Sequence, residues 1–178
     1  MKRSFIALVC VVSMLVLFST MAIAGQKATP EECIKKCQEA AKYLSEEAAK
    51  GPEAEKAALA YLDQKENNRF IWKDTYVWVL CCDCQPKTDA THPFKKKLVG
   101  ADLSGIKDKQ GELFFLQFCE IAQKPHGGWV DYWWPKVGEK KASRKITYIL
   151  NVPGTKYQVG AGIYDDNMDV AKLTELIK

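Results

Sequence analysis

The sequence has few of the residues that enzymes use for acid–base chemistry. It contains two histidines in 178 residues, and one of them, His126, lies in a Pro-His-Gly-Gly turn. Motifs of the G-x-S-x-G, P-loop, H-E-x-x-H, C-x-x-C-H and glycine-rich dinucleotide-binding types are missing. We therefore expect no enzymatic activity and no cofactor, and a protein that acts by binding.

Long apolar runs are missing after residue 24, but one precedes it. The dipeptide Lys2-Arg3 is followed by an almost unbroken apolar run over residues 5–18 and by the small-x-small pattern Ala22-Ile23-Ala24. This pattern predicts a cleaved signal peptide over residues 1–24 and an exported, periplasmic domain over residues 25–178. The alternative is a retained membrane anchor, because a span needs about 20 apolar residues and this segment just reaches that length.

The charge pattern gives no reason to expect a nucleic-acid partner. Loss of the two basic residues of the signal peptide leaves 24 of the 26 basic residues against 22 acidic ones, a net charge of +2. No dense basic stripe with interleaved aromatic residues occurs. The run Lys95-Lys96-Lys97 is interpreted as a solvated loop. We expect a soluble exported domain without a membrane span after removal of the signal peptide.

The sequence has seven cysteines, and Cys10 lies in the predicted signal peptide, so six remain in the exported domain. An even number of cysteines in an exported chain predicts disulfides. Six cysteines allow fifteen pairings, and the sequence does not choose among them. Cys33 and Cys37 lie four residues apart on a predicted helix, where Cβ atoms are about 5–6 Å apart, too far to bond to each other. We expect each to pair with another cysteine, and a disulfide to tie the turn around Cys84 to one of them. The candidates are Cys33, Cys37, Cys81, Cys82, Cys84 and Cys119.

Helix signals fill the first part of the domain and strand patterns fill the rest. The segment Thr29-Pro30-Glu31-Glu32 is a helix start, with a capping hydroxyl, proline at the first position and acids in the first turn. Short turns between the later strands favour an antiparallel sheet flanked by helices, an α+β fold. The predicted helices cover residues 30–50, 52–64, 112–123 and a closing segment capped by Asp166 or Asn167; the predicted strands cover residues 70–72, 76–80, a short stretch before His92, 128–134, 145–151 and 157–164.

Several blocks of sequence occur together in the order and spacing of a known family. They are Gly51-Pro52-Glu53-Ala54, Phe70-Ile71-Trp72-Lys73-Asp74-Thr75-Tyr76-Val77-Trp78, Thr91-His92-Pro93, Leu98-Val99-Gly100-Ala101-Asp102-Leu103, Gly127-Gly128-Trp129-Val130-Asp131-Tyr132-Trp133-Trp134-Pro135, Lys145-Ile146-Thr147-Tyr148, Val152-Pro153-Gly154-Thr155 and Gly160-Ala161-Gly162-Ile163-Tyr164. With these blocks the chain resembles the single Cache domain family of type 2. The resemblance implies a PAS-like antiparallel sheet of about five strands, flanked by a long N-terminal helix pair. It also implies an extracytoplasmic domain that binds small molecules, often short carboxylates, as the sensing end of chemoreceptors and histidine kinases.

The sequence departs from that family in two places. The chain ends at Lys178 without a second membrane segment or signalling domains, so we expect a stand-alone domain that serves a membrane receptor or kinase. The turn after the first long strand reads Cys81-Cys82-Asp83-Cys84, where the family usually has an acidic turn with glycine. An alternative function is therefore a thiol redox or metal-handling protein centred on Cys81, Cys82 and Cys84, with His92 as a further zinc ligand. A third is a structural module that forms a homodimer through its first helix.

A carboxylate pocket needs a cation or strong donors at one end and apolar walls around the rest. Lys145 matches the family's lysine and His92 its histidine, so both are expected at the ligand's polar end. Strand periodicity groups aromatic rings on one face of the sheet, where indole N–H and phenol O–H groups can bind carboxylate oxygens. Asp74 would instead favour a ligand with an amine, and any single ring could be simply core. The predicted ligand-binding residues are Tyr76, Trp78, His92, Pro93, Tyr132, Trp134 and Lys145.

Overall fold

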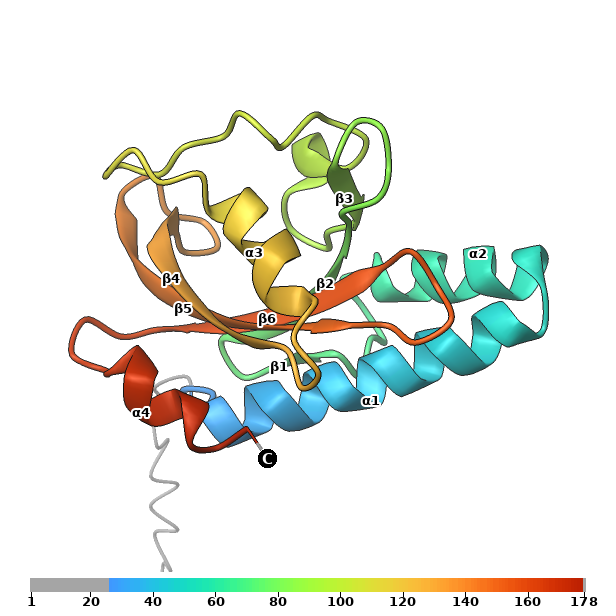
Figure 1. Ribbon diagram of the computed structural model, residues 1–178, viewed down its shortest axis with the longest axis horizontal. Coiled ribbons are helices and arrows are strands. Elements are labelled where there is room, and N and C mark those ends of the chain that lie inside the picture. The colour runs from blue at the N-terminus through green and yellow to red at the C-terminus, as the bar shows by residue number, and fades with distance from the viewer. Residues whose placement is uncertain (1–25, 178) are drawn as a thin grey trace, which may run out of the picture.

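The computed structural model describes residues 26–177, so the predicted signal peptide lies outside the described residues. An antiparallel sheet forms the centre of the domain, with the strand order β1-β2-β6-β5-β4 and with β3 paired to β2 (Figure 1). The α+β class is confirmed, with six strands where about five were predicted. The strands are β1 (Ile71–Trp72), β2 (Thr75–Cys81), β3 (Thr88–Thr91), β4 (Gly128–Pro135), β5 (Ala142–Asn151) and β6 (Gln158–Tyr164). The helices are α1 (Pro30–Ala49), α2 (Pro52–Leu62), the 3-10 turn η1 (Lys96–Leu98), α3 (Phe114–Ala122) and α4 (Val170–Thr174).

Helix α1 begins at the predicted start and covers one face of the sheet (Figure 1). The Thr29 side chain accepts from the backbone N–H of Glu32, and the Glu32 carboxylate accepts from the backbone N–H of Thr29, a reciprocal cap. Its buried residues are mostly small and recur at helical spacing, which allows close packing against β5 and β6. They are Cys33, Cys37, Ala40, Ala41 and Leu44. Within residues 26–177, none of the helices is both long enough and apolar enough to span a membrane.

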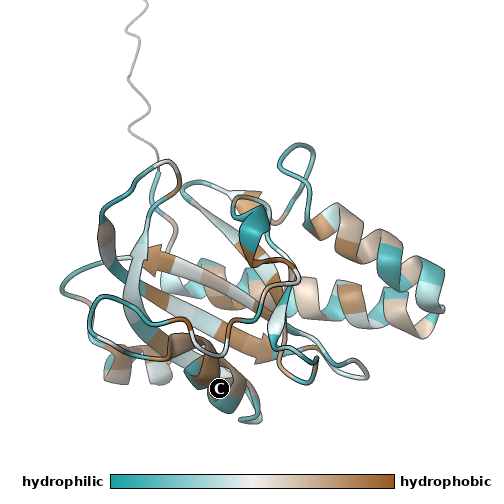
Figure 2. Ribbon diagram, turned by 90° about the horizontal axis from the view of Figure 1, so that it is seen from above, coloured by the Kyte–Doolittle hydropathy of each residue, from teal (hydrophilic) through white to brown (hydrophobic). Residues whose placement is uncertain are grey.

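The sheet separates two hydrophobic cores. Alternation along β2 sends Val77 and Val79 into the core shared with α1 and α2, and Tyr76 and Trp78 into the core shared with α3. Figure 2 shows the resulting distribution, with hydrophobic patches on the strands and mainly hydrophilic loops around them. The second core contains the predicted site, so the fold places the aromatic face of the sheet under α3.

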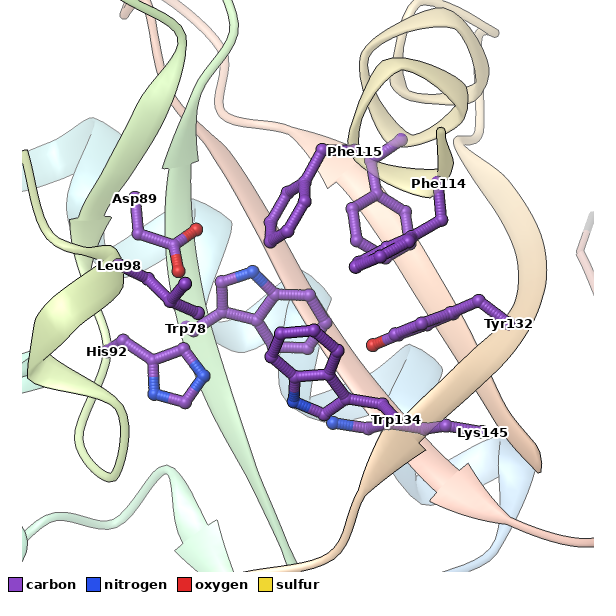
Figure 3. Close-up of a pocket in the computed structure, with 10 residues that line it drawn as sticks. Trp78, Asp89, His92, Leu98, Phe114, Phe115, Tyr132, Trp134 and Lys145 are labelled. Carbon is purple, nitrogen blue, oxygen red and sulfur yellow. The ribbon is translucent and has the colours of Figure 1, made fainter. Parts of the chain in front are cut away.

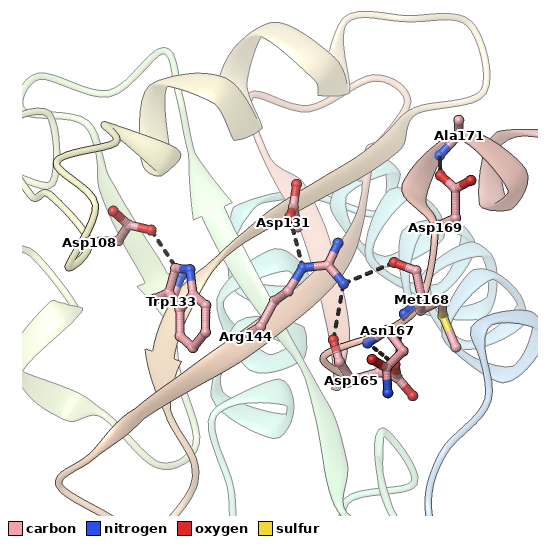
Figure 4. A network of polar contacts seen from close by, with 9 residues as sticks. All are labelled: Asp108, Asp131, Trp133, Arg144, Asp165, Asn167, Met168, Asp169 and Ala171. Atoms are coloured by element: carbon pink, nitrogen blue, oxygen red, sulfur yellow. Dashed lines mark hydrogen bonds and ion pairs between the residues drawn. The ribbon is translucent and has the colours of Figure 1, made fainter.

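Polar contacts from Arg144 on β5 hold the C-terminal segment against the sheet (Figure 4). The Arg144 guanidinium forms an ion pair with Asp131 on β4 at 3.0 Å and donates to the carbonyl oxygens of Asp165 and Met168 at 3.1 and 2.9 Å. The carboxylate of Asp169, two or three residues beyond the predicted caps, accepts from the backbone of α4. The predicted cap at Asp166 or Asn167 was wrong because Asp165 holds this stretch as a turn, accepting from the backbone of Asn167 and Met168.

The predicted cysteine pairing was wrong. Cys81 and Cys82 point to opposite faces of the sheet, as neighbours on a strand do. Cys82 therefore meets α3 and bonds to Cys119, while Cys81 bonds to Cys84 in the following turn. The remaining two residues of the predicted set, Cys33 and Cys37, are buried free thiols that pack in the α1 core as small apolar side chains. Burial raises the pKa of Cys33 to about 12.

These disulfides also bear on the metal hypothesis. Zinc is bound by thiolates, and the sulfurs of the C-x-x-C segment are engaged in disulfides instead. No group of three or more potential metal-ligating side chains occurs within residues 26–177.

Candidate ligand-binding site

A small cavity lies between α3, the segment that contains β3 and η1, and the aromatic face of the sheet (Figure 3). Its volume is about 10 Å³, room for a single water molecule. Its lining is mainly aromatic and includes one carboxyl, one imidazole and one lysine amine. The lining residues are Trp78, Asp89, His92, Leu98, Phe114, Phe115, Phe118, Tyr132, Trp134 and Lys145.

Lys145 provides a buried ammonium group at this cavity. It lies on β5 directly opposite Tyr132 on one neighbouring strand and Tyr164 on the other, and it is 2% exposed. Its Nζ atom lies 5.0, 5.1 and 5.4 Å from the ring centroids of Tyr76, Trp78 and Tyr164. Among residues 26–177 no carboxylate lies within ion-pair distance of Nζ. Burial lowers the pKa of Lys145 to about 8, because water no longer solvates its charged form.

Two glycines on β6 make room for the side chains at the bottom of the cavity. A Cβ atom at position 160 would lie 2.7 Å from a ring carbon of Trp78, which pairs with Gly160 across the strands. A Cβ atom at position 162 would lie 2.9 Å from Cε of Lys145 and 2.8 Å from a backbone oxygen of β5. The Gly160-Ala161-Gly162 pattern is therefore needed for the indole and the lysine to lie flat against the sheet.

The contacts of His92 fix its neutral form and its orientation. The Asp63 carboxylate, just after α2, accepts from the backbone N–H of His92 at 3.0 Å. Nδ1 of the ring accepts from the backbone N–H groups of Lys95 and Phe94 at 2.9 and 3.3 Å, which assigns the ring proton to Nε2. Nε2 lies 3.4 Å from the Tyr76 hydroxyl. Burial, reinforced by Lys145, lowers the pKa of His92 to about 3, so the ring is a neutral donor at neutral pH.

The predicted aromatic residues gather around the cavity with one difference. Trp78, Tyr132 and Trp134 line it. Tyr76 does not line the cavity; its ring packs against His92, with 5.1 Å between the two ring centroids. Pro93 is buried next to His92 without lining the cavity. The Tyr132 ring stacks on Phe114 of α3 at 4.4 Å, and its hydroxyl lies 3.2 Å from the Thr147 hydroxyl.

Two groups of lining residues were missed by the sequence analysis. The first consists of Phe114, Phe115 and Phe118 of α3, whose apolar pattern indicated burial but not which surface they would meet. The second is Asp89 on β3, a single acid in a short predicted strand. Asp74, considered as an amine-binding residue, lies away from the cavity, where it is exposed and accepts from the backbone N–H of Ala28 at 2.8 Å.

Comparison with known proteins agrees with this architecture. A family model for the Cache domain matches residues 41–169. The chain belongs to the Cache domain family. Its relatives include the sensor domains of chemotaxis receptors, so the chain is a Cache domain of the sensor type.

Three individual proteins illustrate the relation. The methyl-accepting chemotaxis protein McpP of Pseudomonas putida is 34% identical over 95 residues, which are 53% of this chain and span 17% of that receptor. The structure of a periplasmic sensor domain of a chemotaxis protein is 29% identical with a TM-score of 0.61, covering 75% of this chain and 90% of that one. A Cache chemosensory domain solved for its carboxylic acid recognition is 24% identical with a TM-score of 0.59, covering 75% and 88% of the two chains. The likeness to this last protein shows the fold.

Proposed function

We propose that this Cache domain binds a small carboxylate in the cavity beside Lys145 and serves as the sensing element for a membrane receptor or kinase. The observation that carries the proposal is the buried Lys145 ammonium, which faces an aromatic cavity with no carboxylate partner among residues 26–177. A buried cation without a counter-charge is costly, and a ligand carboxylate supplies one through charge-assisted hydrogen bonds. The Nε2–H of His92 is a second donor on the same cavity.

The size of the cavity supports a small ligand. About 10 Å³ holds one water molecule, so even an acid of four or five heavy atoms requires its walls to move outwards. Among the lining residues, Trp134 and Leu98 are partly exposed. Their side chains can therefore move outwards with the smallest loss of buried apolar surface. The carboxylic acid recognition described for a fold neighbour is consistent with this ligand class.

The proposed location is the periplasm, after cleavage of the signal peptide predicted over residues 1–24. Two disulfides within the described residues support an oxidising compartment. They also disfavour the thiol redox alternative: Cys81–Cys84 lies between a strand and a turn, whereas reactive C-x-x-C thiols usually lie at the N-terminus of a helix.

The test is a thermal-shift screen of residues 25–178 against acetate, propionate, pyruvate and lactate, followed by calorimetry. A ligand at a hundredfold excess over Kd stabilises the folded state by about 2.7 kcal/mol. Lys145→Met should abolish binding. The matched control is Lys156→Met, which removes an exposed lysine that lies over a different ring, that of Tyr157. Unchanged affinity in Lys145→Met would refute the assignment of the site.

A further inference from the structure

Asp89 is a buried carboxyl group that lacks a partner. It is 1% exposed, and neither of its side-chain oxygens has a hydrogen-bond partner within residues 26–177. Leaving such a group unsatisfied costs free energy comparable to a lost hydrogen bond or more. Because Asp89 lines the cavity, a group that enters the cavity can satisfy it.

Asp89 and Lys145 face the cavity from opposite sides without forming an ion pair (Figure 3). Both residues line the same cavity, and burial raises the pKa of Asp89 well above its usual range while the Lys145 ammonium acts in the opposite direction. The Asp89 carboxyl group and the Lys145 ammonium group are thus both available to a ligand in the cavity. Asp89 is the one carboxylate among the lining residues, and His92 offers a donor rather than a second acceptor.

We propose that Asp89 binds an ammonium group of the ligand while Lys145 binds its carboxylate, so that the site takes a small amino acid in preference to the corresponding simple acid. This inference rests on the proposed function and narrows its ligand class. A simple carboxylate supplies the counter-charge for Lys145 but brings no N–H donor for the two unpartnered Asp89 oxygens, and it places a second acid in the same small cavity. A zwitterion satisfies both groups at once and brings no net charge into the buried site. The Trp78 ring lies between the two groups in Figure 3, where its face can also contact an ammonium group.

The experiment compares ligand pairs that differ by the amino group. Calorimetry at pH 7 measures glycine against acetate, and alanine and β-alanine against propionate. In the unsubstituted protein, at least one amino acid should bind ten times more tightly than its simple acid. Asp89→Asn, which keeps the shape of the side chain, should lose this preference while propionate binding is retained or improved. The matched control, Asp74→Asn, removes an exposed acid outside the cavity and should leave the preference unchanged.

The outcomes separate this inference from the proposed function. If the unsubstituted protein binds propionate as tightly as the amino acids, the role of Asp89 is refuted and carboxylate binding stands. The unsubstituted protein decides this even if Asp89→Asn fails to fold. An amino-acid preference that survives in folded Asp89→Asn also overturns the inference. If neither class binds, or if Lys145→Met binds propionate normally, the proposed function itself fails.

Discussion

Replacing Lys145 by methionine should stabilise the empty protein at pH 7, because the site holds a buried charge for its ligand. The pKa of Lys145 falls from its ordinary 10.5 to about 8 on folding. At about 1.4 kcal/mol per pKa unit, keeping the group charged in the folded state costs about 3 kcal/mol. Methionine has a similar shape and no charge, so the substitution removes this cost without opening a large cavity.

The aromatic rings around the ammonium oppose part of that gain. Three ring centroids lie within 5.4 Å of Nζ, and cation–π contacts of this kind stabilise by roughly 1–2 kcal/mol together. The net expectation for Lys145→Met is therefore an increase of about 1–2 kcal/mol in the free energy of unfolding. For a domain of this size, that raises Tm by roughly 2–8 °C.

Chemical denaturation as a function of pH tests this prediction. Between pH 8 and 10.5 the unfolded state binds more protons at position 145 than the folded state, so the stability contribution of Lys145 rises with pH in that window. The advantage of Lys145→Met over the unsubstituted protein should be largest below pH 8 and should shrink towards pH 10.5. A variant that is less stable at pH 7, or a difference that does not change with pH, would show that the ammonium is already satisfied in the empty protein.

Three further predictions follow from the same geometry. Carboxylate affinity should be constant below pH 8 and fall above it as Lys145 loses its proton, which calorimetry from pH 6 to 10 measures; a flat profile would contradict the role of Lys145. Gly162→Ala should destabilise the fold by about 1–3 kcal/mol and weaken binding, because the added Cβ would lie 2.8 Å from a backbone oxygen and 2.9 Å from Lys145. Normal affinity together with a normal Tm would show that Lys145 does not need the space that Gly162 leaves. Replacing both Cys82 and Cys119 by alanine should lower the free energy of unfolding by about 4 kcal/mol, because their disulfide closes a loop with a separation of 37 residues. Replacing both Cys81 and Cys84 should lower it by only about 2 kcal/mol, because that loop has a separation of 3 residues. Equal denaturation midpoints for the two double variants would refute this loop-length argument.

The parts of the fold that were predictable follow local rules. The cap at Thr29 and the proline after it define the start of α1, and strand alternation assigns Trp78 and Tyr132 to one face without knowledge of the partner strands. Lys145 was singled out because it matches a family block, and antiparallel pairing places it opposite Tyr132; its role in ligand binding stays a prediction.

The features that were missed depend on distant parts of the chain. The pairing of Cys82 with Cys119 requires that α3 lie over the end of β2, which neither segment encodes alone. Asp89 was overlooked because an acid in a short strand usually faces water. It is buried here because η1 packs against β3 and because the cavity that Asp89 faces is closed by side chains of α3 and the sheet. Long-range packing, rather than local propensity, therefore decides the polar content of the cavity.

The disulfide between Cys82 and Cys119 makes the expansion of the cavity one-sided. A covalent bond from Cys119 fixes the second half of α3 to the end of β2, so the wall formed by the phenylalanines of α3 is held in place. The opposite wall, which carries Asp89, His92 and Leu98, has no such bond to the sheet within the described residues. Because β3 of that wall is paired with β2, we expect a ligand that widens the cavity to displace mainly η1 with Leu98, and Trp134 on β4. The Asp63 carboxylate, bound to the His92 backbone, connects this side of the cavity to the end of α2.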